Sequence, residues 1–231
     1  MRTAVVTGAA RGIGREIARR LAPDYDRLVL ADLSPALAET ALELERLVDV
    51  TPVQANLASA DGVVAVVRAA GDVAALVNNA GITRDSRLVN MSEEDFRAVL
   101  EVNLGVPFRL ISALQWTEPA SVVNIASRAY LGNFGQFNYA MSKGGVVGLT
   151  RACAISLAPG VRVNAVAPGL TATEMIETIP DDVLQRMIAA IPLDRMGSPT
   201  EIADVVAWLC SDRSSYVTGQ VVVVGGGRSL T

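Results

Sequence analysis

The run TGAARGIG, residues 7–14, joins a short β-rich stretch to the first helical pattern of the chain. A helix N-terminus presents unpaired backbone amides to an anion, and glycines let the backbone approach a pyrophosphate. The spacing G-x-x-x-G-x-G departs from the general G-x-G-x-x-G, but its place between strand and helix favours a dinucleotide site over a tight turn. Arg11 fits a phosphate contact and a solvated side chain equally well. The contacts expected from this loop are Gly8, Arg11, Gly12, Ile13 and Gly14.

An acidic residue, Asp32, ends the second β-rich stretch, about 20 residues after the glycine loop. A carboxylate in that position accepts hydrogen bonds from the ribose hydroxyls of a dinucleotide and repels a 2′-phosphate. The sequence therefore favours NAD over NADP. The competing interpretation is a helix cap, because Ser34-Pro35 follows at once.

Tyr139 and Lys143 are four residues apart in a helical pattern, so both side chains lie on one face of the helix. Reduction of a carbonyl group needs a proton donor at the oxygen, and a phenol with a pKa of about 10 is a poor one at neutral pH. A neighbouring cation favours the phenolate and lowers that pKa. Ser127 lies at a preceding strand end, where on its own it could be an ordinary turn residue. Without this context, the pair would be an ordinary helix-surface contact.

The elements that must position these residues follow an alternating β and α pattern. The expected strands are nearly continuous in Val, Ile, Leu and Ala, as is typical of parallel strands covered on both faces. We therefore predict a single α/β domain of the doubly wound Rossmann type, with strand order 3-2-1-4-5-6-7 in a seven-stranded parallel sheet. The expected strands are residues 3–7, 27–31, 52–55, 74–78, 121–126, 161–166 and 220–224. The expected helices are residues 14–22, 35–48, 59–70, 92–114, 138–157 and 199–210.

One segment, residues 170–197, interrupts this rhythm with a single short helix near residues 181–190. In doubly wound sheets ligands bind outside the carboxyl ends of the strands. We expect the segment to be a lid over such a site, with Met175 and Ile176 on it.

Composition limits the possible functions of the 231 residues. Hydrophobic residues make up 51% and charged residues 19%, yet no uncharged stretch approaches the roughly 20 residues that span a membrane. We expect an intracellular, cytoplasmic protein without a signal peptide. A net charge of −4 argues against nucleic-acid and anionic-membrane partners. The lack of histidine and the separation of Cys153 and Cys210 argue against a metal site.

Several motifs in order along residues 2–227 resemble the short-chain dehydrogenase/reductase family. Besides the glycine loop, they are NNAG at residues 78–81, the Y-x-x-x-K of residues 139–143 and the PGxxxT-like run at residues 168–173. The resemblance implies catalytic roles for Ser127, Tyr139, Lys143 and Asn103, the last holding a water that leads to Lys143. It also implies a cofactor contact by Lys143 at the nicotinamide ribose. The other implied cofactor contacts are Asn56, Leu57, Asn79, Ala80, Gly81, Tyr139, Pro168, Gly169, Thr171 and Thr173.

Within that family, NNAGITRD and the closing stretch of the chain are similar to the 3-oxoacyl-[acyl-carrier-protein] reductases. Two positions depart from them. Those enzymes mostly use NADPH, whereas Asp32 predicts NADH, and Asn56 stands where the family usually has Asp. The resemblance implies interconversion of a 3-oxoacyl and a 3-hydroxyacyl thioester. The alternatives are dehydrogenation of another secondary alcohol, such as a sugar alcohol or hydroxysteroid, and non-catalytic cofactor binding.

The resemblance also implies a homotetramer in which helices 92–114 and 138–157 pair between subunits. Aromatic and basic residues between Ser127 and Tyr139 are candidates for substrate contacts or for a subunit interface. These are Arg128, Tyr130, Phe134 and Phe137. An acidic carrier protein would need a basic patch, to which Arg87 or Arg128 could contribute.

Overall fold

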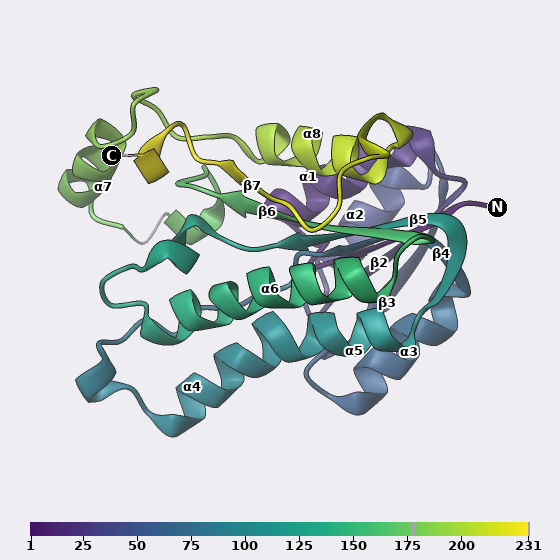
Figure 1. Ribbon diagram of the computed structural model, residues 1–231, viewed down its shortest axis with the longest axis horizontal. Helices are drawn as coiled ribbons and strands as arrows, with labels where there is room; N and C mark the ends of the chain where they lie inside the picture. Colours follow the sequence, from purple (N-terminus) through teal and green to yellow (C-terminus); the bar gives the residue numbers. More distant parts are fainter. Residues whose placement is uncertain (177–178, 231) are drawn as a thin grey trace.

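The computed structural model describes residues 1–176 and 179–230. Its centre is one parallel sheet with the strand order β3-β2-β1-β4-β5-β6-β7, as predicted. Helices cover both faces of the sheet, with α1, α2 and α8 on one side and α4, α5 and α6 on the other (Figure 1). The strands are β1 (Thr3–Thr7), β2 (Arg27–Asp32), β3 (Asp49–Gln54), β4 (Asp72–Asn78), β5 (Gln115–Ile125), β6 (Val161–Pro168) and β7 (Val221–Val224). The helices are α1 (Gly12–Leu21), α2 (Leu37–Leu44), α3 (Ala60–Ala70), α4 (Glu93–Leu100), α5 (Val106–Ala113), α6 (Phe137–Ser156), α7 (Asp181–Ala189) and α8 (Pro199–Cys210).

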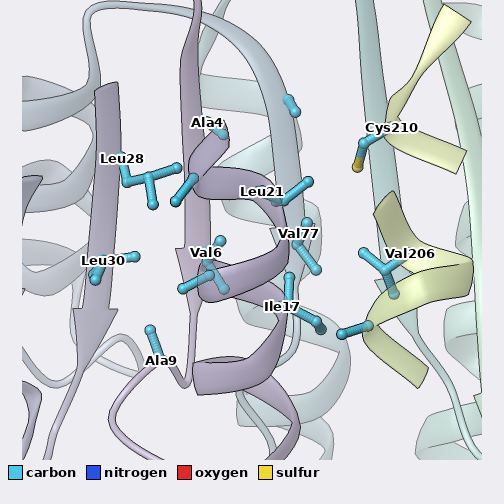
Figure 2. Close-up of a cluster of buried hydrophobic side chains, with 14 of the residues drawn as sticks. Ala4, Val6, Ala9, Ile17, Leu21, Leu28, Leu30, Val77, Val206 and Cys210 are labelled. Atoms are coloured by element: carbon cyan, nitrogen blue, oxygen red, sulfur yellow. The ribbon is translucent and has the colours of Figure 1, made fainter. Parts of the chain in front are cut away.

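Each face of the sheet has its own hydrophobic core. Because side chains alternate along a strand, Val6 of β1 faces the layer with Ile17 of α1 and Val206 of α8. Figure 2 shows these three side chains pointing toward one another. Val5 faces the other layer, with Leu110 of α5. The two cores fix β1 and its following loop from both sides.

The predicted helix 92–114 is wrong as a single element. A π-helical turn, Glu101–Gly105, separates α4 from α5, and the N–H of Val106 donates to the carbonyl of Glu101. Pro107 has no N–H to offer the carbonyl of Asn103 four residues earlier, and a wider turn accommodates this defect. The strands predicted at 52–55 and 121–126 also begin earlier in the structure, as β3 and β5.

The segment 170–197 follows β6, and backbone hydrogen bonds join its two ends. The N–H of Ala172 donates to Gly197 (2.9 Å), and the N–H of Gly197 donates to Leu170 (3.0 Å). Between these ends lie a short 3-10 turn, Glu174–Ile176, and α7, which extends away from the sheet (Figure 1). The side chain of Met175 lies outside the part of the chain that the structure describes.

Over residues 1–176 and 179–230, no helix is long and apolar enough to cross a membrane. In the same ranges no group of three or more His, Cys, Asp or Glu side chains could hold a metal ion.

Candidate active site

The glycine loop is built around two glycines that the surrounding backbone leaves no room to replace. A Cβ on Gly14 would lie 1.9 Å from the carbonyl oxygen of Gly8, and one on Gly8 would lie 2.8 Å from Nδ2 of Asn79. Gly8 also has a φ of +66°, a conformation that favours glycine. Strand, loop and helix are therefore packed as closely as a pyrophosphate site needs.

The NNAG motif after β4 holds this loop in place. Asn79 Nδ2 donates to the carbonyls of Thr7 and Gly8, both at 3.0 Å. Thr7 Oγ1 accepts from the N–H groups of Asn79 and Ala80, again at 3.0 Å. Asn79 and Ala80 thus contribute to the site by fixing the loop. This role of Thr7 was not predicted from the sequence, although a hydroxyl group at the end of a buried strand needs hydrogen-bond partners.

The N-terminus of α1 is open toward the loop. Arg11 is the residue before the helix, and its side chain provides no cap for the helix amides. Unpaired amides at a helix N-terminus form an anion site, so Gly12, Ile13 and Gly14 fit the pyrophosphate of a dinucleotide. The guanidinium of Arg11 instead donates to Glu174 Oε2 at 2.7 Å.

Asp32 faces the glycine loop from the end of β2. Its Oδ2 accepts from the N–H of Ala10 (3.0 Å) and its Oδ1 from the N–H of Ser34 (2.9 Å). Both interpretations of Asp32 thus find support, since it fixes the turn before α2 and also lies at the loop. A carboxylate offers about four acceptor positions, so two remain for ribose hydroxyls.

Asn56 and Leu57 follow β3 at the same edge of the sheet. Asn56 Oδ1 accepts from the N–H of Ala58 (3.0 Å), which leaves one acceptor position on that oxygen. Leu57 is buried, and its carbonyl accepts from Arg109 Nη2 at 3.1 Å. The local turn therefore presents the Asn56 side chain outward, where an adenine could reach it.

The end of β6 supplies the remaining predicted cofactor contacts. Pro168 is the last residue of the strand, and a Cβ on Gly169 would lie 2.7 Å from Cα of Gly225. Thr171 Oγ1 donates to the carbonyl of Gly169 at 3.2 Å. Thr173 Cγ2 lies near the glycine loop, 3.7 Å from where a Cβ of Gly12 would be. Thr173 therefore lies beside the glycine loop, and the other three residues lead to it from the end of β6.

Tyr139 lies on α6 with Ser127 beside it. Burial raises the pKa of the Tyr139 phenol, and a hydrogen bond with Ser127 opposes this rise. Ser127 Oγ also accepts from the N–H of Ala129 at 3.1 Å, which fixes the serine at the start of a 3-10 turn. The sequence predicted a lowered pKa for Tyr139. In the structure, burial outweighs the hydrogen bond with Ser127, and the pKa is raised.

Lys143 is buried one turn further along α6. Its Nζ donates to the carbonyl of Ile125 at 2.7 Å and lies 5.6 Å from the centre of the Tyr139 ring. Burial lowers the pKa of Lys143 to about 8. At neutral pH the side chain is therefore mainly a cation that gives up its proton more readily than an exposed lysine.

Asn103 lies in the π-helical turn and connects three segments. Its Nδ2 donates to Ser142 Oγ and to the carbonyl of Ile82, both at 3.0 Å, while its Oδ1 accepts from the N–H of Ile82 at 2.8 Å. A Cβ on Gly81 would lie 3.1 Å from Asn103 Oδ1 and 3.6 Å from Lys143 Nζ. Gly81, Asn103 and Lys143 therefore surround one small space.

A second asparagine, Asn138, was missed from sequence. It is fully buried, its Nδ2 donates to the carbonyl of Arg84 (3.0 Å), and its Oδ1 accepts from the N–H of Tyr139 (2.7 Å). It therefore ties the loop after β4 to the first turn of α6. In the sequence, the position of Asn138 immediately before Tyr139 could have indicated this role.

The aromatic residues between Ser127 and Tyr139 gather on the other side of α6. Tyr130, Phe134 and Phe137 line a cavity of about 690 Å³ together with Met141 and Gly144. Met141 is two residues from Tyr139, hence about 200° around the helix from it. This arrangement favours the interface interpretation of Phe134 and Phe137 over direct substrate contact. Of the two arginines considered for a basic patch, Arg87 lies at this cavity and Arg128 begins the turn after Ser127.

Comparison with known proteins agrees with this geometry. A family model described as enoyl-(acyl carrier protein) reductase matches residues 8–229. A 3-oxoacyl-[acyl-carrier-protein] reductase of Staphylococcus aureus is 41% identical, over 99% of this chain and 98% of its own length.

Two solved structures from Brucella melitensis share the fold. A 3-oxoacyl-[acyl-carrier protein] reductase superposes with a TM-score of 0.90 and 34% identity, covering 98% of this chain and 90% of its own. A short-chain dehydrogenase/reductase of the glucose/ribitol dehydrogenase type superposes with a TM-score of 0.89 and 36% identity, covering 98% and 96%. The chain therefore belongs to the short-chain dehydrogenase/reductase family, oxidoreductases that bind a nicotinamide cofactor.

Proposed function

We propose that the protein reduces a 3-oxoacyl thioester to its 3-hydroxyacyl form with NADH. The observation that carries the chemistry is the grouping of Ser127, Tyr139 and Lys143 beside the glycine loop and the NNAG motif. The substrate class rests on the full-length similarity to the Staphylococcus aureus 3-oxoacyl-[acyl-carrier-protein] reductase.

The nicotinamide, when bound, supplies the hydride, and the chain's own residues bind, orient and protonate. Tyr139 donates the proton to the carbonyl oxygen, and the Lys143 ammonium, 5.6 Å from the centre of its ring, favours the phenolate that is left. Ser127 donates a hydrogen bond to the same oxygen and stabilises the charge that grows there. Lys143 holds the nicotinamide ribose, and Asn103 holds a water next to Lys143.

Preference for NADH follows from the position of Asp32. The 2′-phosphate of NADPH would meet a carboxylate already fixed by the N–H of Ala10. Asp32→Asn keeps an oxygen for that amide, removes the charge and loses the acceptor for the N–H of Ser34. We expect it to shift the ratio of kcat/KM values toward NADPH by about tenfold, from a repulsion of about 1–2 kcal/mol. An unchanged ratio would show that Asp32 acts only as a cap.

Turnover of acetoacetyl-coenzyme A tests the substrate class. Oxidation of NADH by the purified protein, with NADPH measured in parallel, should show turnover that prefers NADH. The second candidate is oxidation of a sugar alcohol, favoured by the similarity to the glucose/ribitol dehydrogenase type. NAD reduction with ribitol, and none of the expected thioester turnover, would establish that alternative.

The outer face of α6 supports a homotetramer. Gly144 and Gly148 lie in the helix interior, where a Cβ on either would meet nothing within 4 Å. Glycine there costs about 0.5–1 kcal/mol relative to alanine, so the chain alone gives no reason for it. Met141 and Ile155 on the same helix are exposed apolar side chains. Close approach of a second α6 would explain both features.

Gly148→Leu tests this assembly. The added side chain should convert the tetramer into smaller species, measured by light scattering after size-exclusion chromatography. Ala38→Leu makes a comparable enlargement on the exposed part of α2 and should leave the mass unchanged. Wild-type protein that runs as a monomer contradicts the tetramer.

The lid at residues 170–197 and the cytoplasmic location remain predictions. The geometry that supports a lid is the closed base of the segment beside the end of β6.

A further inference from the structure

An ion pair connects two segments that are 163 residues apart in sequence and meet at the candidate cofactor site. Arg11 Nη1 lies 2.7 Å from Glu174 Oε2. Arg11 belongs to the glycine loop, and Glu174 begins the 3-10 turn that follows Thr173. Thr173 itself lies against Gly12. The first turn of the segment 170–197 therefore contacts the loop at two neighbouring points.

The rest of this segment is attached elsewhere. Its base is closed by backbone hydrogen bonds between Ala172 and Gly197, and the N–H of Leu193 donates to the carbonyl of Gly226 after β7 (3.2 Å). The ion pair therefore joins an otherwise separately anchored segment to the glycine loop.

Charge also distinguishes this contact from a direct phosphate site. Glu174 would repel a diphosphate if its carboxylate were uncompensated, and Arg11 compensates it. The same guanidinium uses one of its five N–H donors for Glu174.

We propose that Arg11 and Glu174 form a strap that holds residues 173–176 against the glycine loop and retains the cofactor. Opening of this ion pair precedes cofactor release. Arg11 is thus a positioning residue, and not the direct phosphate contact considered from the sequence. The proposal rests on the proposed use of a nicotinamide cofactor at this loop and not on the identity of the substrate.

Release of NADH measured by stopped-flow fluorescence tests the strap, with excess NAD as the trap. We expect Glu174→Gln to accelerate release about two- to fivefold, the range that an exposed ion pair supplies. Arg11→Met should accelerate release further, because it leaves Glu174 uncompensated. Arg11→Met combined with Glu174→Gln should release no faster than Arg11→Met alone.

The matched control breaks another exposed ion pair of the same segment. Asp182 and Arg186 pair at 2.9 Å within α7, so Asp182→Asn should leave the release rate unchanged. Salt gives a second readout, because screening weakens exposed pairs. The difference between wild type and Glu174→Gln should therefore shrink at high ionic strength.

Two results would overturn the strap. If Arg11 were a direct phosphate ligand, Glu174→Gln would free it and slow the release of NADH. An unchanged release rate in Glu174→Gln is equally decisive against the proposal. If the protein binds NADH but reduces no thioester, the proposed substrate is wrong and the strap still stands. If the wild type binds neither NADH nor NADPH, both the proposed function and the strap are wrong.

Discussion

The buried ammonium of Lys143 predicts that its removal abolishes activity without destabilising the fold. Only 4% of the residue is exposed, and burial lowers its pKa from 10.5 to about 8. One pKa unit corresponds to about 1.4 kcal/mol, so retaining the charge costs the native state about 3 kcal/mol at pH 7. Lys143→Met also removes the hydrogen bond to Ile125, which costs about 1–3 kcal/mol. We therefore expect the variant to be more stable by about 0–2 kcal/mol at pH 7.

The pH dependence has a definite sign. Below pH 8 lysine is protonated in both the folded and the unfolded states, so the penalty is present in full. Between about pH 8 and 10.4 the unfolded chain binds more protons than the native state, and wild-type stability rises with pH relative to the variant. Any advantage of Lys143→Met should therefore decrease across that interval.

Urea unfolding at pH 7 and pH 10 measures both effects. Protein concentration must be equal in all samples, since assembly contributes to apparent stability. Loss of turnover with retained stability is the expected result. A variant that is less stable than wild type at pH 7 by more than about 1 kcal/mol, or a difference that does not change with pH, refutes the reasoning.

Three other substitutions examine different parts of the site. Tyr139→Phe should remove most turnover while NADH affinity, measured by fluorescence titration, stays near that of wild type; full activity would contradict the proton-donor role. Gly14→Ala places a Cβ 1.9 Å from the Gly8 carbonyl and should destabilise the fold by at least about 1–3 kcal/mol and weaken NADH binding, visible as a lower Tm that NADH no longer raises. Asn138→Ala leaves the Arg84 carbonyl and the Tyr139 N–H without their partner, so it should cost about 1–3 kcal/mol in urea unfolding and lower kcat; unchanged values would show that water replaces the side chain.

The sheet was predictable because its strands are buried on both faces. Runs such as Ala4-Val5-Val6 need apolar neighbours above and below, and this requirement marks parallel strands regardless of any motif. Alternation with helices then left few possible topologies. The positions of Gly8 and Gly14 were predictable for a related reason, since close packing of strand, loop and helix excludes any side chain.

Other features depended on contacts that spacing does not encode. The π-helical turn arises from Pro107, whose missing N–H affects a carbonyl one turn earlier. The balance that raises the pKa of Tyr139 depends on how deeply α6 is buried, which the four-residue spacing to Lys143 cannot reveal. The pairing of Arg11 with Glu174 joins segments whose proximity exists only in the folded chain.

The hydrogen bonds between Thr7 and Asn79 have a consequence for the order of folding. These residues are 72 positions apart, so the glycine loop acquires its final support only when β4 has docked beside β1. Bringing together residues so far apart lowers the entropy of the chain before the new contacts can offset this loss. Parallel strand pairing is slow for the same reason. A fragment ending before β4 would carry every glycine of the loop yet lack the amide that holds it. Cofactor binding would then stabilise only chains in which β4 has already docked, and would shift the folding equilibrium after that step.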